Sequence, residues 1–112
     1  MSVAYRFYRA TRSNPPTLRD VSSNEALGIP QADSESDEDY RAISTYTKAR
    51  KCAQQAQRFG LGGYIAELTI PGDGPIMIGH RSKNGHCNLI GPPEDLLATV
   101  GLTVTVGKAL EG

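Results

Sequence analysis

The sequence predicts an α+β domain, in which a small, mostly antiparallel split sheet packs against one well-supported helix at about residues 47–59. Short segments alternate apolar and polar side chains, as in YIAELTI at residues 64–70, and this alternation is typical of strands. Only the segment at 47–59 repeats its apolar side chains at helical spacing. With 112 residues and no internal repeat, the chain is expected to form a single domain, residues 1–112.

The first strand is expected at residues 4–10, AYRFYRA, where alternation places Tyr5, Phe7 and Arg9 on one face. An arginine on a face that is otherwise buried needs a carboxylate or phosphate partner. The alternative is an edge strand whose arginine head reaches water. Arg9 is therefore a candidate anion-binding residue.

The next segment is expected to be mostly irregular. A short helical turn is expected at residues 24–27, and Gly28 suits its end because glycine adopts left-handed backbone conformations easily. Residues 29–40 show no periodicity and predict a loop. The acidic run at 33–39 favours a solvated loop, with an acidic patch that meets a basic partner as the alternative.

A strand at residues 41–46 and the helix at about 47–59 follow. The apolar stripe of this helix consists of Ala49, Cys52, Ala53, Ala56 and Phe59. Thr45 or Thr47 suits the N-cap, and Gly60 suits the C-terminal stop. The small side chains of the stripe favour a helix that lies close against the sheet.

The second half of the chain predicts shorter elements. The expected strands are 64–70, 76–78, 86–90 and 102–106, with a turn at 71–75, a loop at 79–85 and a short helix from residue 92 to 97. The helix starts at a diproline followed by two acids, and both features are common in a first helical turn.

Composition argues against several function classes. The formal net charge of +0 argues against bulk nucleic-acid binding, which requires a basic excess. Cys52 and Cys87 form neither a CxxC motif nor a Cys/His cluster, so no metal site is expected. No apolar run approaches the roughly 20 residues of a membrane span. A cytoplasmic protein is expected, and a secreted effector would share these features.

Several residues are candidates for chemistry. A helix N-cap requires only one hydroxyl side chain, but the segment ISTYT carries three, at Ser44, Thr45 and Thr47. Glu94 is a candidate acid that also serves as an ordinary acid at a helix start. Glu67 is an alternative acid in mid-strand, and the histidines at 80 and 86 lie in a polar, glycine-bounded region.

The order of these features resembles the ADP-ribosyltransferase fold. In the arginine class of that family an arginine on the first strand precedes a Ser-Thr-Ser element, and a glutamate follows. The matching residues here are Arg9 in FYRAT, Ser44-Thr45-x-Thr47 in ISTYT, and Glu94 in GPPEDLL. The chain has an inserted tyrosine in the hydroxyl element and lacks the Glu-x-Glu pair of arginine-modifying members.

The resemblance implies that NAD is the substrate and lies in a cleft, with its phosphates near Arg9. The hydroxyl strand, including Tyr46, would support the nicotinamide side, while Glu94 would stabilise the oxocarbenium-like ribosyl centre. Ser44 is a further catalytic candidate, and His86 is an alternative to the acid. The implied activity is ADP-ribose transfer to an unknown acceptor, or NAD hydrolysis, in a toxin or effector setting.

Two other functions are compatible with the sequence. The same fold without its chemistry would be a module that binds a protein partner through the acidic loop and the sheet edge. A weaker alternative is nucleic-acid binding through Arg6, Arg9, Arg12 and the aromatic residues between them, against which the zero net charge counts.

Overall fold

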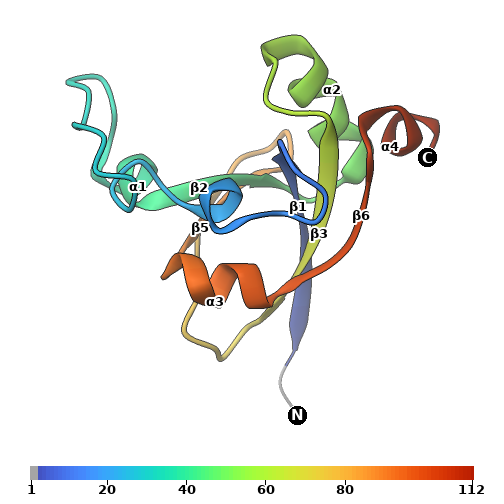
Figure 1. Ribbon diagram of the computed structural model, residues 1–112. Helices are drawn as coiled ribbons and strands as arrows, with labels where there is room; N and C mark the ends of the chain where they lie inside the picture. The colour runs from blue at the N-terminus through green and yellow to red at the C-terminus, as the bar shows by residue number, and fades with distance from the viewer. Residues whose placement is uncertain (1–2) are drawn as a thin grey trace.

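Six strands form one antiparallel sheet in the order β4-β5-β2-β1-β3-β6 (Figure 1). The computed structural model describes residues 3–112. The strands are β1 (Ala4–Thr11), β2 (Ala42–Tyr46), β3 (Tyr64–Pro71), β4 (Met77–Arg81), β5 (His86–Ile90) and β6 (Val100–Thr105). The helices are the 3-10 helix η1 (Leu18–Val21), α1 (Asp37–Arg41), α2 (Ala49–Phe59), α3 (Pro93–Ala98) and α4 (Val106–Glu111).

The sheet is split between β1 and β2. Strand β1 pairs with β3 along its whole length, from Ala4↔Pro71 to Thr11↔Tyr64. Its register with β2 comprises only Tyr8↔Tyr46, and past this pair the two strands separate. Strand β2 pairs instead with β5 from Ala42↔Ile90 to Tyr46↔His86. A gap in the backbone ladder therefore opens in the middle of the sheet, beside Arg9.

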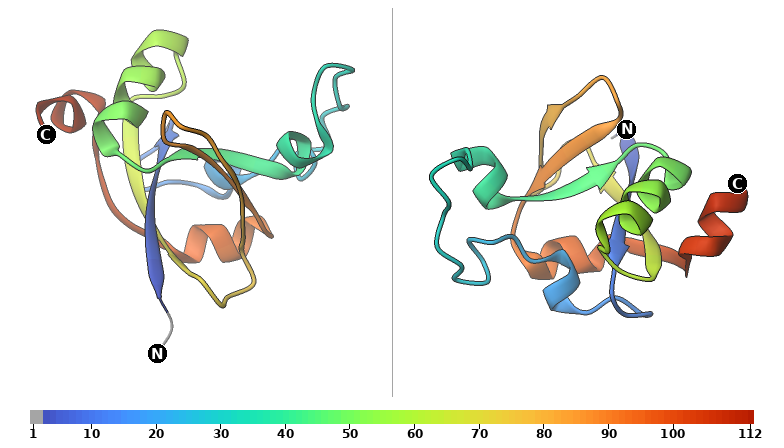
Figure 2. Two further views of the ribbon diagram at one scale, coloured as in Figure 1. Left: turned by 180° about the vertical axis from the view of Figure 1, so that it is seen from behind. Right: turned by 90° about the horizontal axis from the view of Figure 1, so that it is seen from above.

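Each face of the sheet carries its own hydrophobic cluster. The two further views show that helices lie on both sides of the sheet (Figure 2). On one face η1 and α3 cover the first cluster, which is built around Phe7, Leu68 and Leu89. On the other face α2 and α4 cover the second, smaller cluster, which includes Ile65 and Ala53. The small residues of α2 allow it to lie close to the sheet, as the sequence predicts.

The structure confirms the α+β class, the predicted strands and the position of the main helix. Gly60 ends α2 in the left-handed conformation with φ 64°, and Gly28 closes the turn at 24–28 with φ 72°. Strand β4 continues to Arg81, so the loop expected at 79–85 is shorter than predicted.

Two helices were not expected from the sequence. Residues 37–41, predicted as loop, form α1, because the Ser36 hydroxyl accepts a hydrogen bond from the Asp39 amide and three acids occupy the first turn. Residues 106–111 form α4, with the Thr105 hydroxyl accepting from the Lys108 amide. Both N-cap residues are of the preferred types, serine and threonine. The helices are too short for their sequences to show a helical pattern after the cap.

The predicted start of α2 was wrong. Lys48 is the N-cap and makes no side-chain capping bond. Thr45 is fully buried, and its hydroxyl donates to the Cys87 carbonyl over 2.8 Å. Phe59, expected on the apolar stripe, is 60% exposed because the last turn of α2 projects beyond the sheet. Among residues 3–112, no helix is long and apolar enough to cross a membrane.

Replacing Phe7 by alanine tests the first core. Phe7 is fully buried between η1, β3 and the neighbouring strands, so Phe7→Ala is expected to lower the free energy of unfolding by about 3–5 kcal/mol. Urea denaturation measures the change. The control is Leu102→Ala, whose side chain is 70% exposed and should cost less than about 0.5 kcal/mol. Equal losses in the two variants would contradict this core.

Candidate functional site

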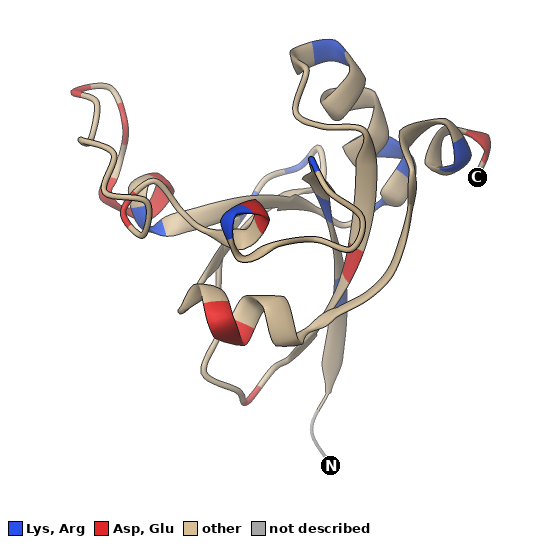
Figure 3. Cartoon of the chain, viewed as in Figure 1, with Lys and Arg blue, Asp and Glu red and all other residues tan. Residues whose placement is uncertain are grey.

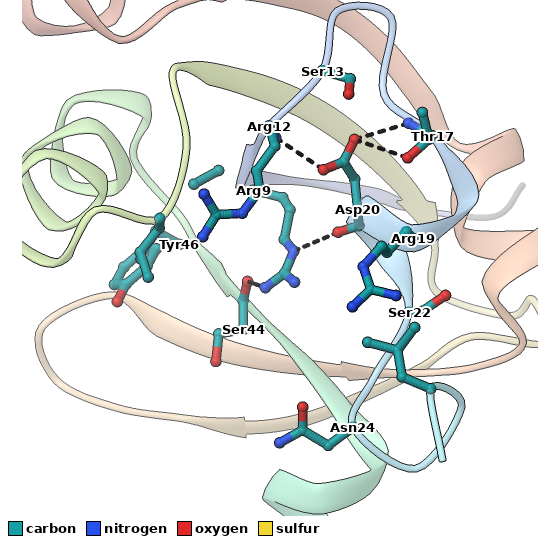
Figure 4. Close-up of a pocket in the computed structure, with 13 residues that line it drawn as sticks. Arg9, Arg12, Ser13, Thr17, Arg19, Asp20, Ser22, Asn24, Ser44 and Tyr46 are labelled. Atoms are coloured by element: carbon teal, nitrogen blue, oxygen red, sulfur yellow. Dashed lines mark hydrogen bonds between the residues drawn. The ribbon is translucent and has the colours of Figure 1, made fainter. Parts of the chain in front are cut away.

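A cavity of about 470 Å³ opens where β1 and β2 separate (Figure 4). Strand β1 supplies Arg9, β2 supplies Ser44 and Tyr46, and the segment before and within η1 supplies further polar side chains. A second cavity of about 310 Å³ shares Arg9 and Ser44 with the first and extends to His86. The two therefore form one cleft of the size that small-molecule sites commonly have.

Arg9 crosses the gap in the sheet. Its Nε donates to the backbone carbonyl of Asp20 over 3.0 Å, and its Nη1 donates to the carbonyl of Ser44 over 2.9 Å. Within residues 3–112, Nη2 donates no hydrogen bond and no carboxylate forms an ion pair with Arg9. Burial lowers the pKa of Arg9, and Cys52, Asp20 and Tyr46 oppose that shift, so the guanidinium stays charged.

The first cavity has an excess of positive charge. Arg12 and Arg19 line it together with Arg9, and the salt bridges between described residues involve none of the three. Asp20 is the one acid that lines it, and this carboxylate accepts from the backbone amides of Arg12 and Thr17, each over 2.9 Å. Three guanidinium groups thus share the cavity with a single carboxylate, which already accepts two backbone hydrogen bonds. This excess of positive charge favours an anionic ligand, and a phosphate suits the donor geometry of arginine.

The second cavity has a different character. His86 lies edge-on to Tyr46, with ring centroids 5.4 Å apart and an interplanar angle of 76°. Two acids, Glu35 and Asp39, also line this end of the cleft. Burial lowers the pKa of His86 below its usual range, and His80 adds to this effect while Asp39 opposes it. His86 is therefore neutral at pH 7 and able to accept a proton.

The phenol of Tyr46 also keeps its proton at neutral pH. Burial raises its pKa, with Cys52 adding to the shift and Arg9 opposing it. The ring stands at the junction of the two cavities, because Tyr46 lines the first and contacts His86 of the second. An aromatic face at this junction suits a flat or cationic ring.

The cleft brings together four of the residues that the sequence singled out: Arg9, Ser44, Tyr46 and His86. Thr45 and Thr47 line neither cavity. The hydroxyl of Thr45 is buried on Cys87, and the amide of Thr47 pairs with the Gly85 carbonyl. Strand alternation explains the difference, since Ser44 and Tyr46 project from the face opposite to Thr45.

The structure does not bring Glu94 to this cleft. Helix α3 turns Leu96 into the core beside η1, so Glu94 in its first turn is exposed and lines neither cavity. Glu67, the alternative acid, lies on β3 with its carboxylate 3.8 Å from the Arg6 guanidinium. It too is absent from both linings.

The sequence interpretation did not place Arg19 and Asp20 at one end of the cleft or Asp39 at the other, and it considered Arg12 only for nucleic-acid binding. The arginines belong to a basic N-terminal stretch, but their convergence depends on η1 folding back over β1. Asp39 was assigned to a solvated loop. Ser36 followed by three acids was the available signal for a helix there, and hence for a fixed carboxylate.

No protein-family model matches the sequence, and neither the curated proteins nor the solved structures include one that matches this chain. Within the described part of the chain, no group of three or more histidine, cysteine, aspartate and glutamate side chains is arranged to hold a metal ion.

The titration of His86 tests the electrostatics of the cleft. Its folded-state pKa is expected below the ordinary value of 6.5, and ¹H–¹³C NMR of the imidazole measures it. Asp39→Asn should lower that pKa further and His80→Gln should raise it. Because the shift is downward, stability is full above the unfolded-state value and decreases as pH falls through the folded-state value. Shifts in the opposite directions would contradict this arrangement.

The two cysteines are expected to be inert. Burial raises the pKa of Cys52 to about 12, against smaller opposing effects of Arg9 and a backbone hydrogen bond to Ala10, and burial also raises that of Cys87. A thiol reagent at pH 8 should label neither cysteine in the folded protein and both in urea. Rapid labelling of Cys52 in the native protein would mean that the α2 side of the sheet opens readily, and rapid labelling of Cys87 would mean that the opposite face does.

Proposed function

We propose that this protein is a small ADP-ribosyltransferase-like domain that binds NAD in the cleft and transfers ADP-ribose to an acceptor or hydrolyses NAD. The observation that carries the proposal is the charged Arg9 guanidinium in the split of the sheet, with donors left for a ligand, beside Ser44 and Tyr46. An arginine on the first strand and hydroxyls on the second are what the family resemblance implies.

The basic end of the cleft is where the pyrophosphate binds in this proposal. Arg9 contributes the donors that its two backbone bonds leave free, and Arg12 and Arg19 contribute exposed guanidinium groups. Arginine recognises phosphate oxygens with paired, charge-assisted hydrogen bonds, which are stronger than neutral ones. The absence of salt bridges to these three side chains within residues 3–112 supports a role in binding an anion.

The other end receives the nicotinamide riboside. Tyr46 offers an aromatic face to the cationic nicotinamide ring, and Ser44 offers an exposed hydroxyl beside it. Breaking the bond between C1′ and the ring nitrogen leaves positive charge on the ribosyl group, and nearby negative charge lowers that barrier. The cleft supplies such charge at its second end, where Glu35 and Asp39 lie near His86.

A second candidate function is a non-catalytic module that binds a protein partner. Two observations favour it: Glu94 lies outside the cleft, and the acidic run around α1 is exposed at one end of the molecule (Figure 3). A basic partner surface would complement this acidic end. In that case, substitutions in the cleft would leave partner binding intact and NAD would not bind.

NAD binding and turnover test the proposal by proton NMR of the purified protein mixed with NAD over hours. The wild type should broaden the NAD signals and release nicotinamide. Arg19→Ala should weaken NAD binding about 10- to 100-fold, since a hydrogen bond to a charged group contributes about 1.5–3 kcal/mol. Arg19 is exposed, and its side chain donates no hydrogen bond to any residue from 3 to 112, so its loss should leave the fold intact.

The matched control is Arg50→Ala, which removes an exposed arginine on α2 outside both cavities and should bind NAD like the wild type. Arg9→Lys keeps the charge but loses the planar fork and should also weaken binding. NAD signals unaffected by the wild-type protein would refute the proposal and favour the partner-binding module.

A further inference from the structure

Helix α1 delivers a carboxylate to the end of the cleft away from Arg12 and Arg19. Asp39 stands one turn before β2, the strand that carries Ser44, and it lines the second cavity with Arg9, Ser44 and His86. Asp39 and His86 line the same cavity, and no ion pair of 4.0 Å or less joins them. A ligand in this cavity would therefore lie against both side chains.

A buried amide holds this carboxylate in place. Asn88 lies on β5 opposite Ser44, and only 3% of its surface is exposed. Its Nδ2 donates to Glu38 Oε2 over 2.8 Å and to Asp39 Oδ1 over 2.9 Å. Both amide hydrogens are thus engaged, and they bring two neighbouring carboxylates together despite their repulsion. Such a buried, fully used amide fixes the position of its partners.

Glu35 and Asp39 line this cavity, Glu38 lies beside Asp39 on Asn88, and the three acids differ in which hydrogen bonds their oxygens accept. Both oxygens of Glu38 accept from the backbone amide of His80, over 3.2 and 3.3 Å. The two oxygens of Glu35 accept from Asn24 Nδ2 and from the Ala32 amide within its own loop. Asp39 Oδ2 accepts no hydrogen bond from a described residue. Asp39 is therefore the acid that combines a fixed position with a free oxygen.

We propose that Asp39, positioned by Asn88, is the carboxylate that stabilises the ribosyl cation when nicotinamide leaves, and that His86 accepts the proton of the attacking nucleophile. This inference rests on the proposed NAD reaction and assigns its acid to α1 rather than to Glu94 on α3. Asn88 is a positioning residue, because it contacts the acid and not the cleft contents.

The chemistry balances without any further reactant. The bond between C1′ and the nicotinamide nitrogen breaks, and both electrons go to the nitrogen, which releases neutral nicotinamide. The oxygen of water, or the nucleophile of an acceptor, forms the new bond to C1′. Its proton passes to the imidazole of His86 and then to solvent, so that NAD⁺ and water give ADP-ribose, nicotinamide and H⁺. The negative charge of Asp39 faces the cationic centre throughout.

The test compares carboxylate-to-amide variants by nicotinamide release and by NAD affinity. Asp39→Asn should lower kcat about 100-fold, as is typical when one preorganised electrostatic group is removed, with NAD affinity changed less than about twofold. Asn88→Ala should lower kcat about tenfold at unchanged KM and should alter the pH profile of kcat, because a loosened Asp39 no longer raises the pKa of His86.

The matched controls are Asp73→Asn, in the exposed turn before β4, and Glu94→Gln on α3, and both should turn over NAD like the wild type. NAD affinity reports whether each variant is folded. If Asp39→Asn fails to fold, Asp39→Glu is used in its place. This variant keeps the negative charge but displaces it by one methylene, so kcat should fall while NAD affinity is retained.

The outcomes separate the two proposals. Wild-type turnover with an unaffected Asp39→Asn variant overturns this inference and leaves the proposed function standing. Loss of turnover in Glu94→Gln alone would return the acid to α3 and also overturn it. A wild type that binds NAD without releasing nicotinamide overturns the catalytic assignment of Asp39. A wild type that binds no NAD overturns both proposals.

Discussion

The fold depends on how the gap between β1 and β2 is bridged. Backbone pairing between these strands is limited to Tyr8↔Tyr46, and beyond it the Arg9 side chain joins β1 to η1 and β2 through two carbonyl groups. A guanidinium is suited to this task because its rigid fork donates in several directions at once. One side chain thus replaces part of a ladder that would otherwise close the cleft.

The same bridge leaves the charge of Arg9 available. The two carbonyl acceptors engage Nε and Nη1 but do not neutralise the charge of Arg9, and burial makes an uncompensated charge costly. An anionic ligand would relieve that cost, so the same side chain that joins the strands is the one that we propose binds the ligand. The rest of the fold is stabilised by two hydrophobic clusters, one on each face, which pack the sheet against its helices.

Charge is separated along the cleft. Arginines gather where η1 folds over β1, and the acids of α1 gather around Asn88 at the other end. NAD has the matching polarity, with a negative pyrophosphate and a cationic nicotinamide ring. The near-zero net charge of the chain conceals this separation, because opposite charges cancel in a sum while remaining apart in space.

Periodicity in the sequence determined the α+β class, the six strand positions to within a few residues, and the helix that Gly60 ends. Alternation also identified Arg9 as an arginine on an apolar face. Local patterns could not place Glu94 or Asp39, because the direction of a side chain at a short helix depends on which residues that helix buries. In the sequence, nothing distinguishes Asn88 from other polar residues. Its position beside α1 depends on the pairing of β5 with β2. Only the tertiary structure decided which acid reached the cleft, since that choice depends on contacts between residues about 50 positions apart.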